Sequence, residues 1–68
     1  MPPNLQSRLK EFRLQKQITQ EDLAQALGVS RQTIIALEQG RYEPSLSLAL
    51  RIADYFKTPV ESIFTPIN

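Results

Sequence analysis

Two polar side chains stand beside two apolar ones on the outward side of a short expected helix, residues 30–39. Arg31 carries a guanidinium group that can donate two parallel hydrogen bonds, and Gln32 carries an amide that offers a donor and an acceptor. Ile35 and Ala36 add methyl groups to the same side. This combination suits recognition of a patterned polar surface by hydrogen bonds and apolar contact.

The composition excludes the common catalytic chemistries. The chain has no cysteine and no histidine, so it lacks the residues for thiolate nucleophiles, histidine-based triads and zinc sites. Glu21 and Asp22 are neighbouring carboxylates, but they stand in the first turn of an expected helix, where the helix dipole favours acidic groups. We therefore expect a binding protein and no enzyme, with no metal, no cofactor and no small-molecule ligand.

Length and hydropathy indicate one soluble domain, residues 1–68. The chain is 41% hydrophobic, and a chain this short buries only about 60% of its unfolded surface, so packing alone must hold it together. No apolar run approaches the roughly 18 residues of a membrane span, and no charged leader precedes a hydrophobic region. With the absence of cysteine, these features predict a cytoplasmic protein.

The net charge is +1, from eight basic and seven acidic residues. Residues 1–41 hold six basic and four acidic residues, whereas residues 42–68 hold two and three. The mild basic excess therefore lies in the half that contains residues 30–39. The excess alone is a weak indication of a nucleic-acid partner.

Helix signals recur along the chain and predict an all-α fold of five short helices. Asn4 can cap a first helix that ends near Lys16, in which Leu5, Leu9 and Phe12 form one apolar stripe. No segment shows the alternation of a strand, so we expect no sheet.

The second and third helices have clear signals at both ends. Thr19 can cap the second helix, and Gly28 can end it in the left-handed conformation. Ser30 can cap the third helix only two residues later, and Gly40 can end it. The two helices are therefore joined by a very short turn.

Two further helices are expected after the third. Ser45 can cap a fourth helix, through about residue 56, and Thr58, Pro59 and Glu61 have the spacing of a capping box that opens a short fifth helix. Residues 65–68 would form a tail. The fourth helix carries two apolar stripes, which are Leu46, Ala49, Ala53 and Phe56, and Leu48, Ile52 and Tyr55.

The segment of about residues 19–39 has the pattern of a helix-turn-helix motif. Ala24 is small enough for two helices to cross closely, and Gly28 stands at the turn. An ordinary helical hairpin within a bundle is the alternative. The apolar positions of the motif are Leu23, Leu27, Val29, Ile34 and Leu37.

The stretch "ITQEDLAQALGVSRQTIIALEQGRYEPSLSLALRIADYFKTPVESIF" resembles the phage repressor and Cro family, also called the xenobiotic-response-element type. The resemblance covers about residues 5–64, and short single-domain bacterial regulators that carry "SRQTI" and "EPSL" are the most similar. It implies a compact five-helix repressor-like DNA-binding domain whose second and third helices form the motif. It also implies sequence-specific binding to operator DNA.

In this family the second helix of the motif lies in the major groove of DNA. Arg31 can then pair with guanine and Gln32 with adenine, each pair discriminating by about 1–3 kcal/mol. Ile35 either packs against thymine methyl groups or is an isolated exposed apolar residue, and Ala36 offers only a methyl contact.

Other side chains are expected at the DNA backbone. Gln20 matches the family glutamine that binds phosphate beside the N–H groups of a helix start. For the residues that follow the third helix, a solvated turn is the alternative. The further candidates for backbone contacts are Ser30, Thr33, Gln39, Arg41 and Tyr42.

Arg13 and Glu38 match an arginine–glutamate pair that links the first and third helices in this family. The resemblance implies a structural role, in which the pair braces the recognition helix. A mutant of Arg13 that lost DNA binding would therefore report unfolding as readily as a lost contact.

Taken together, these features predict a cytoplasmic transcriptional repressor that binds palindromic double-stranded DNA as a homodimer, because two half-sites supply more specificity than one. The alternatives are an antitoxin-type autorepressor that neutralises a partner toxin and a protein-interaction module on the same fold. The candidate dimer interface, which could equally complete the core of the monomer, is Val60, Ile63, Phe64 and Ile67.

Overall fold

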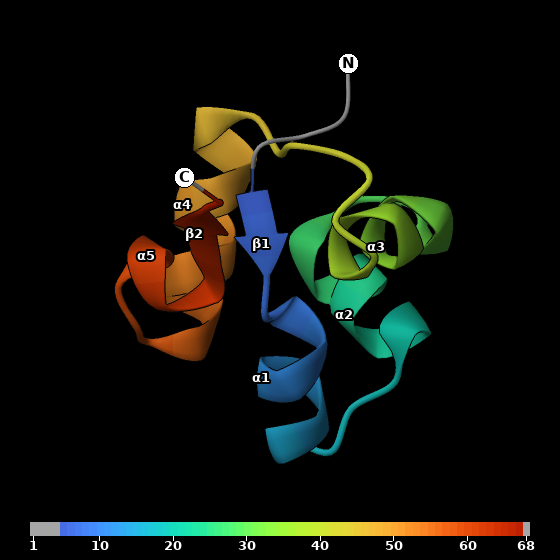
Figure 1. Cartoon of the computed structure of the whole chain (residues 1–68). Coiled ribbons are helices and arrows are strands. Elements are labelled where there is room, and N and C mark those ends of the chain that lie inside the picture. The colour runs from blue at the N-terminus through green and yellow to red at the C-terminus, as the bar shows by residue number, and fades with distance from the viewer. Residues whose placement is uncertain (1–4, 68) are drawn as a thin grey trace.

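Most of the chain is helical, and its two ends meet in a small sheet (Figure 1). The computed structural model describes residues 5–67. In Figure 1, α2 and α3 lie on one side of α1 and β1, and α4 and α5 lie on the other. The elements in chain order are β1 (Leu5–Ser7), α1 (Leu9–Gln15), α2 (Gln20–Leu27), α3 (Arg31–Glu38), α4 (Leu46–Phe56), α5 (Val60–Ile63) and β2 (Phe64–Pro66).

Three helices begin at the hydroxyl residues that the sequence predicts. Thr19, Ser30 and Ser45 each accept a hydrogen bond from the backbone N–H three residues further along the chain. At Thr19 the bond is reciprocal, because the side chain of Asp22 accepts from the Thr19 N–H. These caps satisfy N–H groups that have no partner inside the helix, and the three predictions are confirmed.

Four helices end with a residue in the left-handed conformation. Gly28 and Gly40 have φ of 71°, as the sequence predicts, but Gln17 and Lys57 also have positive φ, 61° and 53°. After each of the four, the next backbone N–H donates to a carbonyl five residues back, which is the Schellman ending. The ending therefore forms at two positions without the residue that favours it most.

The expectations of a helix from Asn4 and of a tail at residues 65–68 are wrong where β1 and β2 lie, at residues 5–7 and 65–66. β1 pairs with β2 in an antiparallel sheet, with Gln6 opposite Thr65, and the Arg8 N–H donates to the Ile63 carbonyl at 2.8 Å. The local apolar spacing could not reveal a partner at the far end of the chain. The cap predicted at Asn4 lies outside the described residues.

The capping box predicted for the fifth helix is also wrong. Pro59 is the capping residue of α5, and no side chain caps this helix. The reason lies in the preceding helix, because the Thr58 N–H donates to the Ala53 carbonyl and completes the end of α4. Thr58 thus belongs to the end of one helix and does not start the next.

The core draws one or more side chains from each helix. The predicted stripe on α4 is wrong at Leu46, which is 75% exposed, and Leu50 one turn later is 54% exposed. No helix within residues 5–67 is long and apolar enough to cross a membrane. The largest fully buried side chains are Leu9, Leu23, Ile34, Leu37, Ile52 and Ile63.

Candidate nucleic-acid interface

Helices α2 and α3 pack directly against each other across a turn of three residues, 28–30. Ala24 is 2% exposed, consistent with a position that admits only a small side chain. Gly28 turns the chain with a φ of 71°, and Val29 packs partly buried against the core. The other apolar positions of the predicted motif are all buried, and they are Leu23, Leu27, Ile34 and Leu37.

The outward side of α3 begins with two exposed polar side chains, Arg31 and Gln32. Within residues 5–67, no hydrogen bond or ion pair holds either side chain, so their donors and acceptors are available to an outside partner. Ile35 and Ala36 are half-buried, and Ile35 is not among the apolar residues packed against the core. The four predicted base-contacting residues therefore share one accessible side of α3.

Ser30 and Thr33 are already engaged with each other. The Ser30 Oγ accepts from the Thr33 N–H at 3.1 Å and lies 2.9 Å from the Thr33 Oγ1. Both residues were expected to contact the DNA backbone. In the structure their side chains take part in the cap of α3.

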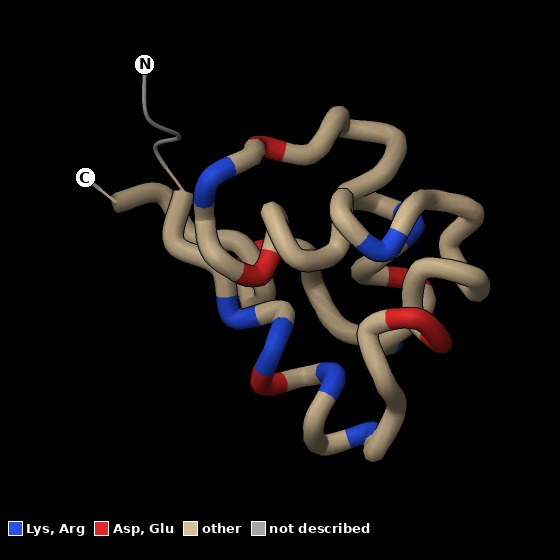
Figure 2. Tube along the Cα trace, turned by 90° about the vertical axis from the view of Figure 1, so that its right-hand side faces the viewer, with Lys and Arg blue, Asp and Glu red and all other residues tan. Residues whose placement is uncertain are grey.

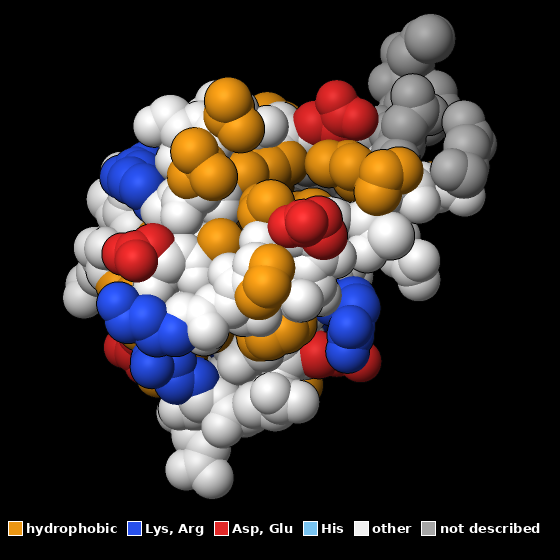
Figure 3. Space-filling view, turned by 90° about the vertical axis from the view of Figure 1, so that its left-hand side faces the viewer, with side chains coloured by type: hydrophobic (Ala, Val, Ile, Leu, Met, Phe, Trp, Pro, Cys, Tyr) orange, Lys and Arg blue, Asp and Glu red, His pale blue; other side chains and the backbone are white. Residues whose placement is uncertain are grey.

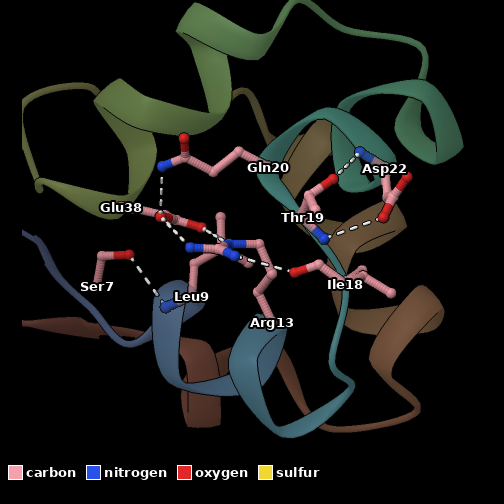
Figure 4. Close-up of polar contacts among 8 residues, drawn as sticks. All are labelled: Ser7, Leu9, Arg13, Ile18, Thr19, Gln20, Asp22 and Glu38. Atoms are coloured by element: carbon pink, nitrogen blue, oxygen red, sulfur yellow. Dashed lines mark hydrogen bonds and ion pairs between the residues drawn. The ribbon is translucent and has the colours of Figure 1, made fainter.

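A buried ion pair fixes the other end of α3 (Figure 4). The Arg13 Nε donates to the Glu38 Oε2 at 2.6 Å, and the Arg13 Nη2 donates to the Glu38 Oε1 at 3.3 Å. The Arg13 Nη1 donates to the Ile18 carbonyl at 2.9 Å. The two side chains are only 9% and 3% exposed, so α1, α3 and the loop before α2 meet at one desolvated pair.

Gln20 joins the same group from the start of α2. Its Nε2 donates to the Glu38 Oε1 at 3.1 Å, as Figure 4 shows. An amide nitrogen carries two N–H donors, so one donor remains for a phosphate oxygen. The carboxylate of Glu38 therefore orients the residue that the sequence analysis placed at the DNA backbone.

The start of α2 is further ordered by the reciprocal bonds between Thr19 and Asp22. The Asp22 Oδ2 accepts from the Thr19 N–H at 3.0 Å, and the Asp22 N–H donates to the Thr19 Oγ1 at 3.0 Å. Hydrogen bonding to the Asp22 carboxylate, by the Thr19 backbone first and by the Thr19 side chain second, lowers the pKa of Asp22 below its ordinary value of 3.8. Asp22 is therefore ionised at neutral pH and serves the cap.

A shallow hollow of about 660 Å³ lies beside the start of α2. It brings Gln20 and Arg31 to one place, although they are eleven residues apart in the sequence. Gln17 also lines this hollow, and the sequence analysis did not identify it. Gln17 adopts the left-handed conformation at the end of α1 and turns the chain here. A glycine at this position would have predicted the turn from the sequence, but a glutamine does not.

A second hollow, of about 270 Å³, lies beside α3. Tyr42, which follows α3 in the chain, lines it together with side chains of α3 and its cap. The sequence analysis placed Tyr42 with the backbone contacts and did not identify this hollow. The residues that line it are Ser30, Gln32, Thr33, Ala36 and Tyr42.

Charge around α3 is mixed. Figure 2 shows basic and acidic positions interspersed along this side of the trace. Arg41 and Gln39 follow α3, are exposed, and have no side-chain partner within residues 5–67. The arrangement offers individual cations at the two ends of α3. No group of three or more potential metal ligands occurs within the same residues.

The expected dimer interface needs a correction. Ile63 is 0% and Phe64 is 7% exposed, so both complete the core of the single chain, which was the open alternative. Val60 is half-buried against that core. Of the four residues, Ile67 alone is largely exposed, at 62%.

Comparison with known proteins adds an independent observation. The helix-turn-helix family model matches residues 9–63. A protein of Methanocaldococcus jannaschii, named an uncharacterized HTH-type transcriptional regulator, is 55% identical over 60 residues, which are 88% of this chain and 91% of that protein. The cryptic phage CTXphi transcriptional repressor RstR of Vibrio cholerae is 26% identical over 57 residues, 84% of this chain and 51% of RstR. A solved structure from Bacteroides fragilis has the same fold, with a TM-score of 0.79 at 24% identity over 90% of this chain and 98% of that chain.

Proposed function

Because the chain belongs to the helix-turn-helix family, of the phage repressor and Cro type, we propose that it is a transcriptional regulator that binds operator DNA. The observation that carries this function is the accessible side of α3, where Arg31 and Gln32 are exposed and have no partner within the described residues. The family and the relatives are regulators, so the chain is a DNA-binding protein and not an enzyme.

In this proposal α3 lies in the major groove, which is wide enough for a helix and presents a different donor and acceptor pattern for each base pair. Arg31 donates two hydrogen bonds to guanine, and Gln32 exchanges a donor and an acceptor with adenine. Each such pair contributes about 1–3 kcal/mol of discrimination against the wrong base. Ile35 and Ala36 supply apolar contacts beside these hydrogen bonds.

The backbone contacts position α3 along the groove. Gln20 has one amide N–H held by Glu38 and a second N–H for a phosphate. Arg41 and Gln39 reach the backbone beyond the other end of α3, and Ser30 and Thr33 add hydroxyl groups at its start. Such contacts set the register of the protein on DNA without carrying sequence information themselves.

We propose that two copies bind a palindromic operator through the face formed by α4, α5 and β2. Figure 3 shows hydrophobic side chains gathered on this face. Leu46 and Leu50 stand one turn apart on α4 and are 75% and 54% exposed, and we add them to Val60 and Ile67. A dimer places two recognition helices about one turn of DNA apart, roughly 34–36 Å.

Repression is the direction of regulation that we propose. It requires only that the protein occupy a promoter, and the relative RstR is named a repressor. Such a regulator acts in the cytoplasm, where its operator is.

Selection from random duplex DNA tests the proposed function. The variants Arg31→Ala and Gln32→Ala should each lose preference at their own base positions in both halves of a palindrome, while Gln15→Ala, an exposed glutamine on α1, should keep the full preference. Thermal unfolding should confirm that all three remain folded. Binding that is blind to sequence would contradict the proposal and direct the search to a protein partner.

A further inference from the structure

The hollow lined by Ser30, Gln32, Thr33, Ala36 and Tyr42, here called the Tyr42 hollow, is not explained by backbone contacts. We propose that it receives the major-groove edge of a thymine, whose methyl group packs between Ala36 and the ring of Tyr42. This inference rests on the proposed binding of operator DNA. It assigns Tyr42 a role in base specificity, whereas the sequence alone placed it at a phosphate.

The position of Tyr42 is fixed by the end of α3. Gly40 turns the chain with a φ of 71°, and the Arg41 N–H then donates to the Ala36 carbonyl at 3.1 Å. The backbone just before Tyr42 is therefore tied to Ala36, which also lines the hollow. Tyr42 is 47% exposed, so its ring borders the hollow without being part of the core.

More of the lining is apolar than polar, and two of its polar side chains are already bonded to each other. The hydroxyl groups of Ser30 and Thr33 lie 2.9 Å apart and cap α3. The polar groups of the lining without a partner within residues 5–67 are the amide of Gln32 and the hydroxyl of Tyr42. Ala36 leaves open the space that a longer side chain would fill.

Thymine is the base whose edge fits this lining. It is the only base of DNA that presents a methyl group in the major groove, next to an acceptor oxygen that an amide or hydroxyl group can bind. Cytosine presents an amino donor and no methyl group. The hollow, of about 270 Å³, is several times the roughly 30 Å³ that one water molecule occupies in the liquid, so it can admit the edge of a base.

Uracil substitution isolates the methyl group. In the duplex that the selection yields, each thymine is replaced by uracil, one position at a time, and the dissociation constant of the wild-type protein is measured. We expect one position in each half-site to lose about fourfold in affinity, which is what one buried methyl group contributes. The other replacements should change affinity by less than this, apart from any position that packs against Ile35.

Two variants then assign the methyl contact to the tyrosine ring. Tyr42→Ala should remove the difference between thymine and uracil at that position, and Tyr42→Phe, which keeps the ring and loses the hydroxyl, should retain the difference. If Tyr42 bound a phosphate through its hydroxyl, both variants would weaken binding equally on both duplexes. That result would overturn the proposal.

The outcomes separate this inference from the proposed function. Sequence-specific binding in which Tyr42→Ala leaves every uracil penalty unchanged would overturn the Tyr42 hollow alone. Absence of any sequence preference would overturn both. Thermal unfolding of Tyr42→Ala should match that of the wild type, because the side chain is half-exposed.

Discussion

The two ends of α3 differ in exposure and in bonding. At its start, Arg31 and Gln32 are exposed and have no partner within residues 5–67. At its end, the side chain of Glu38 is 3% exposed and accepts from Arg13 and Gln20. One helix of eight residues is thus fixed at one end and accessible at the other, and the fixed end sets the direction in which the accessible end meets a partner.

The ion pair between Arg13 and Glu38 contributes more to the orientation of α3 than to net stability. Burying an ion pair costs about as much as the attraction between the charges returns. What the pair provides is a defined meeting point of three segments, and no buried side-chain polar atom in the described chain is left without a partner. At the accessible end the side chains must instead lack partners within the protein, because a donor already bonded there cannot select a base.

The largest expected effect comes from breaking the fixed end with Arg13→Ala. The change leaves Glu38 buried without its cation and should lower the free energy of unfolding by about 3–5 kcal/mol. A domain of this size has roughly 3–10 kcal/mol in total, so urea denaturation should find a much lower midpoint for the variant. Glu11→Ala, which removes an ion pair whose side chains are 51% and 58% exposed, should cost at most about 1 kcal/mol.

A double replacement keeps that prediction testable if Arg13→Ala does not fold. Arg13→Met with Glu38→Leu replaces the pair by apolar side chains of similar size and should restore a folded domain. An Arg13→Ala variant no less stable than Glu11→Ala would contradict the view that α3 is anchored at this end.

The accessible end is tested by Arg31→Lys. The charge is kept, but the fork that donates two parallel hydrogen bonds is lost. We expect a loss of about 1–3 kcal/mol in discrimination for guanine at one position of each half-site, with little change in salt dependence, measured by titration of matched and mismatched duplexes. Unchanged discrimination would mean that Arg31 contributes only its charge.

Gln20 stands between the two ends and should show a smaller effect on both. Gln20→Ala removes the hydrogen bond to Glu38 and should lower the free energy of unfolding by about 1 kcal/mol. It should also weaken binding to all sequences alike, because a phosphate contact carries no sequence information. A loss of preference at particular bases would instead place Gln20 among the base contacts.

The smallest effect is expected at Lys57, at the end of α4. This residue has a φ of 53°, a conformation that glycine adopts without steric cost. Lys57→Gly should raise the free energy of unfolding by about 0.5–1 kcal/mol and leave the selected DNA sequence unchanged. Gly28→Ala, at a φ of 71°, should lower the free energy of unfolding, and thermal unfolding of both variants measures the two changes.

The sequence predicted what depends on near neighbours. The caps at Thr19, Ser30 and Ser45 require only a hydroxyl group and a backbone N–H three residues away, and the buried positions of the motif follow from helical spacing. The side of α3 that carries Arg31 and Gln32 was predicted in the same way.

The parts that the sequence did not predict depend on distant partners. From the sequence, Phe64 was interpreted as surplus apolar surface, whereas it lies in β2, which pairs with β1. Thr58 was interpreted as a cap, whereas its N–H completes the end of α4. The Tyr42 hollow needs the chain to turn at Gly40 before a residue outside α3 can face it. None of these relations leaves a periodic signal.

The pairing of β1 with β2 has a consequence for the order of events in folding. The contacts between α2 and α3 join residues close in sequence, so they can form within microseconds of the start. Gln6 and Thr65 are partners across nearly the whole chain, and closing so long a loop costs more conformational entropy than closing a short one. We therefore expect the strands to pair late, after the helices have packed. The amide hydrogens of this sheet should exchange with solvent before those of α3.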